Sequence, residues 1–199
     1  MKNILIILFI GLTIVSCNKR KIKVPVVAMY GEEEVANNSA IWFFYDDNGK
    51  LDLNEHNRIS STNWFFNVDK HLTLKEAMPE IIRLFIKHHQ KSPHNIKPMK
   101  NYFTYVNSLN NHLSFYQFDS IKYVLISNKK RPSFTKDTLV VEIKNRNFNI
   151  HSNADSLKIV QPVFYGNMNF QEYLSAKAQL KKRFINKAIS KKEYIITDY

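Results

Sequence analysis

The chain has 199 residues, 44% of them hydrophobic and 13% aromatic, and its 29 basic side chains against 17 acidic ones give a formal net charge of +12. This hydrophobic content can build a sizeable core and excludes an intrinsically disordered chain. Only four glycines and a single cysteine occur, which excludes a glycine-rich phosphate-binding loop and an intrachain disulfide.

The first 17 residues combine a basic start, a short apolar segment and the only cysteine of the chain. Lys2 precedes residues 4–15, whose apolar character is interrupted only by Gly11 and Thr13. A helix of this length would span about 18 Å, well short of a hydrocarbon core of roughly 30 Å. The segment therefore predicts a secretory signal peptide rather than a membrane-spanning helix.

The apolar segment ends in Ile14-Val15-Ser16-Cys17, an aliphatic, a variable and a small residue followed by cysteine. This order resembles the lipobox of bacterial lipoproteins, in which the cysteine thiol carries lipid and the preceding signal peptide is removed. The resemblance implies that residues 1–16 are a signal peptide and that Cys17 is the acylated N-terminus, with palmitate as a typical acyl group. A buried hydrophobic start with an incidental cysteine is the alternative.

Residues 17–24 would then form a lipidated tether next to the membrane. Its four cations would each contribute about 1 kcal/mol beside anionic headgroups: Lys19, Arg20, Lys21 and Lys23. The alternative is a solvated tether whose charge has no specific role. In some bacterial lipoproteins an acidic cluster after the cysteine is associated with surface export. No such cluster follows Cys17, so the resemblance implies a periplasm-facing protein of the outer membrane.

The expected partners are the membrane, reached through the lipid anchor, and an envelope protein of unknown identity. The positive net charge does not indicate a nucleic-acid partner, because export removes the chain from the cytoplasm. In addition, 23 lysines and 22 asparagines are typical of AT-rich coding sequence, which adds basic charge without selection for it.

A hairpin is the clearest element of the central region. Residues 41–55 contain Asn48-Gly49, a strong signal of a two-residue turn, and alternate apolar and polar side chains after it. A type I′ turn at this dipeptide would place Phe44 opposite Leu53. The predicted buried face would carry four side chains: Trp42, Phe44, Leu51 and Leu53.

The same stretch nearly fits the calcium loop of EF-hands. Counted from Phe44, oxygen-bearing side chains stand at the third, fifth, ninth and twelfth positions: Asp46, Asn48, Asp52 and Glu55. The first position should be a carboxylate and is Phe44 instead, and the flanks favour strands. We therefore favour the hairpin, keep the four residues only as calcium candidates, and expect no other metal and no cofactor.

Two helices are predicted in the middle of the chain. Residues 74–91 have an apolar stripe at helical spacing, preceded by a capping box of Thr73 and Glu76, although Pro79 would kink the helix or start it. Residues 98–111 begin with a proline that suits a first helical turn and also repeat apolar residues.

Three histidines near the end of the first of these helices raise the question of a zinc site: His88, His89 and His94. Adjacent residues on a helix point apart, and neither a cysteine nor a carboxylate joins the three. We therefore expect a solvated helix end and loop.

Strands are predicted at residues 121–127, 138–143, 148–150 and 157–165, with a turn at Asn145-Arg146. Pro162 within the last of them indicates an edge strand or a bulge. A C-terminal helix should begin near Asn169 and continue to about Ser190. Its basic side would contact anionic envelope surfaces through Lys181, Lys182, Arg183 and Lys187, and a solvated face over a core-packed stripe is the alternative.

Together these elements predict a single α+β domain with a mainly antiparallel sheet, a central β-hairpin and about three helices, the last one basic and amphipathic. We assign residues 25–165 to the α+β domain and residues 166–199 to a C-terminal helix and tail packed on it.

No catalytic constellation is complete in the sequence. Ser127-x-x-Lys130 and Ser133-x-x-Lys136 fit one motif of penicillin-recognising enzymes, but the partner motifs of that family are missing. We lean against an enzyme, single out no catalytic residue, and predict an envelope lipoprotein with a non-catalytic binding or assembly role. Two alternatives stay open: a periplasmic hydrolase without a recognisable motif, and an immunity-type lipoprotein that inhibits a toxin.

Overall fold

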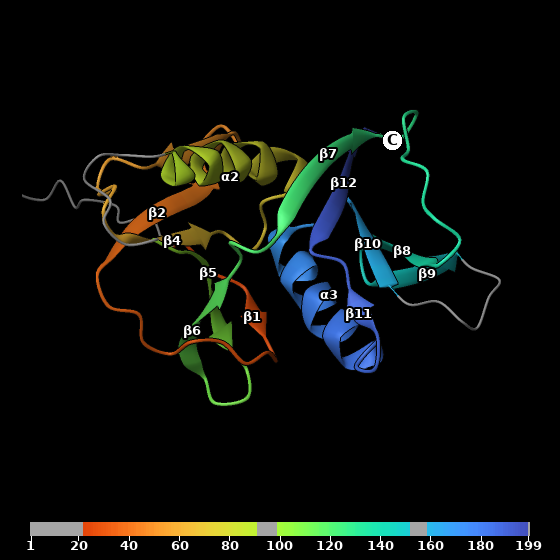
Figure 1. The fold of residues 1–199 in the computed structure, drawn as a ribbon. Helices are drawn as coiled ribbons and strands as arrows, with labels where there is room; N and C mark the ends of the chain where they lie inside the picture. The colour runs from red at the N-terminus through yellow and green to blue at the C-terminus, as the bar shows by residue number, and fades with distance from the viewer. Residues whose placement is uncertain (1–21, 91–98, 152–158, 199) are drawn as a thin grey trace, which may run out of the picture.

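The computed structural model describes residues 22–90, 99–151 and 159–198. Cys17, Lys19, Arg20, Lys21 and His94 lie outside these ranges. Within them, two six-stranded sheets and two helices form the fold, and one core cluster connects both sheets with both helices (Figure 1). Neither of the two helices combines the length and the apolar character that a bilayer-spanning helix requires.

The first sheet contains the strands β1 (Val26–Val27), β2 (Asn38–Tyr45), β3 (Leu51–Asn54), β4 (Asn63–Val68), β5 (Asn101–Asn107) and β6 (His112–Gln117). Strands β2, β4 and β5 run parallel, and helix α2 (Leu74–His89) connects β4 to β5. Strand β3 is the antiparallel hairpin partner of β2 at the edge, and β6 is the hairpin partner of β5. The short β1 runs parallel to the end of β5.

The second sheet contains β7 (Lys122–Ser127), β8 (Thr138–Lys144), β9 (Asn147–His151), β10 (Ile159–Tyr165), β11 (Ala188–Ile189) and β12 (Lys192–Asp198). Its order is β7-β12-β10-β8-β9, with β11 beside β10. Only β9 runs antiparallel to its neighbour. Helix α3 (Phe170–Arg183) follows β10, so residues 166–198 contribute a helix and two strands to this half of the molecule.

The two halves repeat one arrangement of elements. In each, a hairpin, a parallel strand, a helix and a further parallel strand follow in the same order: β2-β3-β4-α2-β5 and β8-β9-β10-α3-β12. Both helices start with a capping box, formed by Thr73 with Glu76 and by Asn169 with Glu172. A shift of 96 residues superimposes the two caps and brings β4 onto β10.

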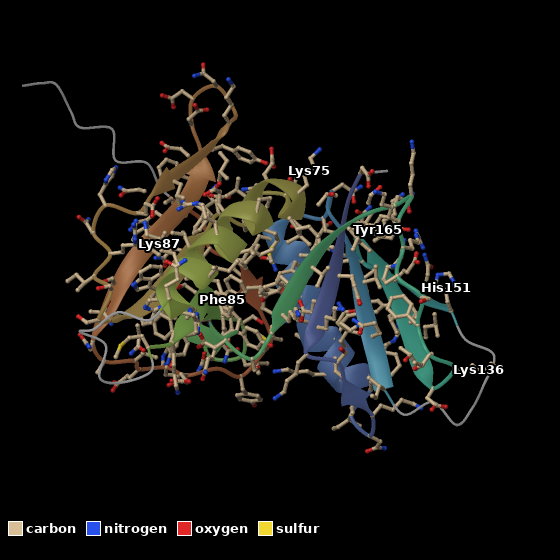
Figure 2. All side chains as sticks on the ribbon, turned by 45° about the horizontal axis from the view of Figure 1, so that its top comes forward. Lys75, Phe85, Lys87, Lys136, His151 and Tyr165 are labelled. Atoms are coloured by element: carbon tan, nitrogen blue, oxygen red, sulfur yellow. The ribbon has the colours of Figure 1, made fainter. Side chains whose placement is uncertain are left out.

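The helix starts meet in a reciprocal contact. Thr73 and Asn169 form an antiparallel bridge, in which Leu74 N donates to Met168 O and Phe170 N donates to Leu72 O, both at 2.8 Å. Such an exchange relates the halves by a local pseudo-two-fold axis. Helix α2 thus starts beside the second sheet at Lys75 and runs over the first sheet past Phe85 and Lys87 (Figure 2).

The expected α+β domain with a mainly antiparallel sheet and about three helices is therefore wrong. Strands hold 43% of the described residues and helices 19%, and the sheets are mostly parallel. The predicted helix over residues 98–111 is strand β5, in which six of seven residues are buried. A strand buried on both faces shows no alternation, and the spacing of its aromatic and β-branched residues also fits a helix.

The hairpin is present, but its predicted register and central position are wrong. Phe43 pairs with Leu53 and Phe44 with Asp52, so that Phe43 rather than Phe44 is completely buried. The connection is longer than two residues because Asp46 N donates to Lys50 O, while the Asp46 carboxylate accepts from the backbone N of Asn48 and of Lys50. A shift of one residue moves each side chain to the opposite face.

We predicted an edge strand or a bulge at Pro162, and the strand that contains it lies in the interior of the sheet, not at an edge. Strand β10 has β8 on one side, and on its other side β11 and β12 pair with residues before and after Pro162. Proline lacks a backbone N–H, and its position between the two partners avoids a missing ladder bond. The Gln161 side chain fills the gap by donating to Lys192 O.

Candidate functional site

The four calcium candidates do not converge on one point. Asp46 caps the hairpin turn through its carboxylate. Glu55 accepts a hydrogen bond from Arg83 Nη2 at 3.0 Å and forms an ion pair with Arg58. Asp52 lies opposite Phe44 in the edge hairpin. Across the ranges that the structure describes, no group of three or more His, Cys, Asp or Glu side chains is placed to hold a metal ion.

His88 is buried rather than solvated, and its ring stacks on Trp64 with centroids 3.8 Å apart. Its Nδ1 lies 2.8 Å from Asn101 Oδ1 and its Nε2 lies 3.1 Å from Thr62 O. The exposed His89 pairs with Asp119 instead. Position 88 continues the buried stripe of α2 through Ile81 and Leu84, and that spacing was the signal that it belongs to the core.

The burial of His88 predicts a pH dependence of stability. Burial lowers the pKa of His88, and the hydrogen bonds to Asn101 and Thr62 only partly oppose this. Because the unfolded state then binds a proton at higher pH than the folded state, the neutral ring contributes stability above pH ~6.5 that is lost as pH falls. We expect the melting-temperature difference between wild type and His88→Gln to shrink from pH 7.5 to pH 5. The exposed His112→Gln serves as control, and an equal shrinkage there would contradict the assignment.

A basic groove of about 550 Å³ lies between α3 and the β8–β9 hairpin. Its described lining residues are Arg146, Asn147, Phe148, Gln179, Lys182 and Arg183. Lys144 pairs with Asn147, so Asn145 and Arg146 form the predicted two-residue turn. Asn145 adopts a positive φ of 56°, a conformation that asparagine tolerates. The turn thus brings Arg146 next to the end of α3.

Helix α3 ends earlier than predicted, at Arg183, and the side chains of its last two residues line the groove. Phe184 N donates to Leu180 O as the helix ends, and Ile185 is 80% exposed. The chain then enters β11, and Ser190 N donates to Val160 O of β10. Recruitment of these residues into the second sheet stops the helix seven residues before the expected end at Ser190.

The predicted cations of α3 separate onto two flanks. Lys182 and Arg183 line the basic groove, where Arg183 Cζ lies 5.0 Å from the centre of the Phe148 ring. Lys181 lies on the other flank, with Nζ 4.9 Å from the centre of the Tyr116 ring. Lys187 follows the helix, and its N donates to Phe184 O. Lys23, which we predicted to belong to the tether and which lies within the described ranges, donates a hydrogen bond from its backbone N to the Asp69 carboxylate in the β4–α2 loop.

No carboxylate among the described residues pairs with Arg146, Lys182 or Arg183. Elsewhere in this half, one exposed and one buried cation do have acidic partners. Arg131 pairs with Glu142, and Lys177 pairs with Glu193. The groove therefore concentrates positive charge that the fold itself does not neutralise.

Lys177 and Glu193 form a buried ion pair beside a smaller cavity of about 140 Å³. Their side chains are 5% and 6% exposed, and Tyr173 OH donates to the other Glu193 oxygen at 2.7 Å. Burial alone lowers the pKa of Lys177, but the Glu193 carboxylate raises it overall. A lysine held in its charged form is not prepared as a nucleophile or base, so the pair is structural.

Sequence reasoning identified Lys182 and Arg183 but missed Arg146, Lys177 and Glu193. Lys177 continues the stripe of Tyr173 and Leu174, which was the available signal of burial. Arg146 belongs to a turn, and its neighbour in the groove, Lys182, is 36 residues away in the sequence. We compared the chain with protein-family models, curated proteins and solved structures, and none of the three comparisons gives a match.

Proposed function

We propose that this protein is a bacterial envelope lipoprotein, anchored through Cys17, that binds an anionic envelope component through the basic groove. The observation that carries the binding role is the groove itself, where Arg146, Lys182 and Arg183 face no carboxylate of the described chain. The lipobox-type sequence around Cys17 supports the anchor, and the basic tether supports a position near anionic headgroups. The protein would face the periplasm from the outer membrane.

The alternative of a periplasmic hydrolase receives no support from the arrangement of acids and bases. Glu55 is paired with two arginines, Asp52 lies on an edge hairpin, and His88 is locked between Trp64 and Asn101. Neither the basic groove nor the smaller cavity gathers any of these side chains among its described lining residues. A non-catalytic role fits these surroundings better.

The anchor predicts a defined chemical form of the mature protein. We expect intact-mass analysis of membrane-purified protein to give residues 17–199 plus two or three acyl chains, because at least two are needed for stable attachment. Cys17→Ser should lose the acyl mass, whereas Lys19→Gln, a neighbouring change, should retain it. A soluble wild-type product that starts at another residue would refute the anchor.

A further inference from the structure

We propose that the basic groove is a binding site for a phosphorylated sugar, either free or as the headgroup of an envelope lipid. This inference rests on the proposed binding role of the same groove and names its ligand class. It follows from a comparison of the two halves, from the origin of Arg146, and from the polar groups that line the groove.

The corresponding place in the first half can be located from the strand pairings. The 96-residue shift brings Val68 onto Phe164. In the neighbouring strand Val68 pairs with Phe43, and Phe164 pairs with Ile143. The hairpin partners of these two residues are Leu53 and Phe148. The groove beside Phe148 therefore corresponds, in the first half, to the contact of α2 with the chain at the end of β3, where Arg83 meets Glu55.

A carboxylate closes that contact in the first half. The same shift brings Arg83 of α2 onto Gln179 of the groove. Arg83 Nη2 donates to Glu55 Oε1 at 3.0 Å, and Arg58 pairs with the second oxygen of Glu55. In the second half cations are present, but the described chain supplies no carboxylate to them. Gln179 thus stands in place of Arg83, the cations of the groove come from other positions, and no carboxylate is among the described lining residues.

The helix dipole does not explain this charge. A helix C-terminus carries about half a negative charge, and basic side chains in the last turn are favourable there. That accounts for Lys182 and Arg183 but not for Arg146, which belongs to the β8–β9 turn. Cations from two separate elements on one groove indicate an anion between them, and arginine guanidinium groups suit phosphate geometry.

The remaining lining residues indicate what is attached to the phosphate. Asn147 and Gln179 each present an amide that both donates and accepts hydrogen bonds, which suits hydroxyl groups. The groove volume of about 550 Å³ falls in the range of roughly 300–1,000 Å³ that is usual for small-molecule sites. A phosphate with a hydroxyl-rich carrier of sugar size matches both features.

The test is isothermal titration calorimetry on the mature full-length lipoprotein in neutral detergent at low ionic strength. We expect glucose 6-phosphate to bind at least about tenfold more tightly than inorganic phosphate, and glucose to bind no more tightly than phosphate. Arg146→Gln should weaken binding of glucose 6-phosphate about tenfold or more, since one charge-assisted hydrogen bond is lost. Gln179→Ala should reduce the preference over inorganic phosphate.

Lys181→Gln is the matched control, because it also removes one positive charge, but from the flank of α3 that faces away from the groove. Its affinity should stay within about twofold of wild type. Equal weakening by Lys181→Gln and Arg146→Gln, equal binding of phosphate and glucose 6-phosphate, or no binding at all would each overturn the proposal. The intact-mass result at Cys17 is independent of all three, so failure here is distinguishable from failure of the anchor.

A competition arm separates the two sources of the ligand. Detergent-dispersed phosphorylated glycolipid that displaces glucose 6-phosphate, while its dephosphorylated form does not, assigns the groove to a lipid headgroup. Displacement by neither glycolipid, with the preference for glucose 6-phosphate intact, assigns it to a free sugar phosphate. Displacement by both forms alike would show recognition without the phosphate and would contradict the proposal.

Discussion

Replacing Lys177 by methionine is expected to lower the free energy of unfolding by about 3–5 kcal/mol. Lys177 and Glu193 are almost completely buried, and removal of the ammonium group would leave the Glu193 carboxylate with the Tyr173 hydroxyl as its one side-chain donor among the described residues. An unpaired buried charge costs far more than the lost contact itself. Glu193→Leu should be destabilising for the same reason, because it leaves the Lys177 ammonium group unpaired.

The double variant Lys177→Met with Glu193→Leu separates this effect from lost packing. Replacement of a whole buried ion pair by apolar side chains is often neutral or stabilising, so the double variant should recover most of the loss. Urea denaturation of the three variants and wild type gives the coupling free energy directly. If the double variant were as unstable as the sum of the single changes, the pair would not be the cause.

Local signals identified those elements whose boundaries are set by neighbouring residues. The capping box at Thr73 predicted a helix that the structure starts at Leu74, and the signal at Asn169 predicted one that starts at Phe170. The turn at Asn145-Arg146 is confirmed for the same reason. Each of these signals depends on hydrogen bonds that span only a few residues.

Parallel pairing between distant segments has no such local signal. Strand β5 is buried on both faces, so neither alternation nor a turn distinguished it from a helix. The structural repeat was equally hidden, because corresponding positions carry different side chains. Trp64 and Phe66 of β4 correspond to Val160 and Pro162 of β10. The two halves share the order in which their strands pair, and amino-acid composition does not reveal that order.

The basic groove was predictable only in part for the same reason. Basic residues near the end of a predicted helix drew attention to Lys182 and Arg183 as a surface for anions. The separation of Lys181 from them follows from the rotation of 100° per residue along α3 and from the walls on each flank. Arg146 enters the site only through the packing of the β8–β9 hairpin against α3.

The register of the first hairpin predicts that truncation of two adjacent phenylalanines has very unequal effects on stability. In the structure Phe43 is completely buried and stacks on Phe66 with ring centroids 5.7 Å apart. Phe44 is half-buried on the other face. We expect Phe43→Ala to lower the free energy of unfolding by about 3–5 kcal/mol, because it removes core contacts and leaves a cavity. Phe44→Ala should cost about 1 kcal/mol or less.

Urea denaturation followed by circular dichroism measures both values on one chain, and each variant is the matched control of the other. The type I′ turn at Asn48-Gly49 that the sequence favours would reverse the order, since a shift by one residue exchanges the two faces. A larger loss of unfolding free energy for Phe44→Ala than for Phe43→Ala would therefore favour the two-residue turn over the pairing in the structure. That result would also contradict the pairing of Phe43 with Leu53. The correspondence between the first-half contact at Glu55 and the basic groove depends on this pairing.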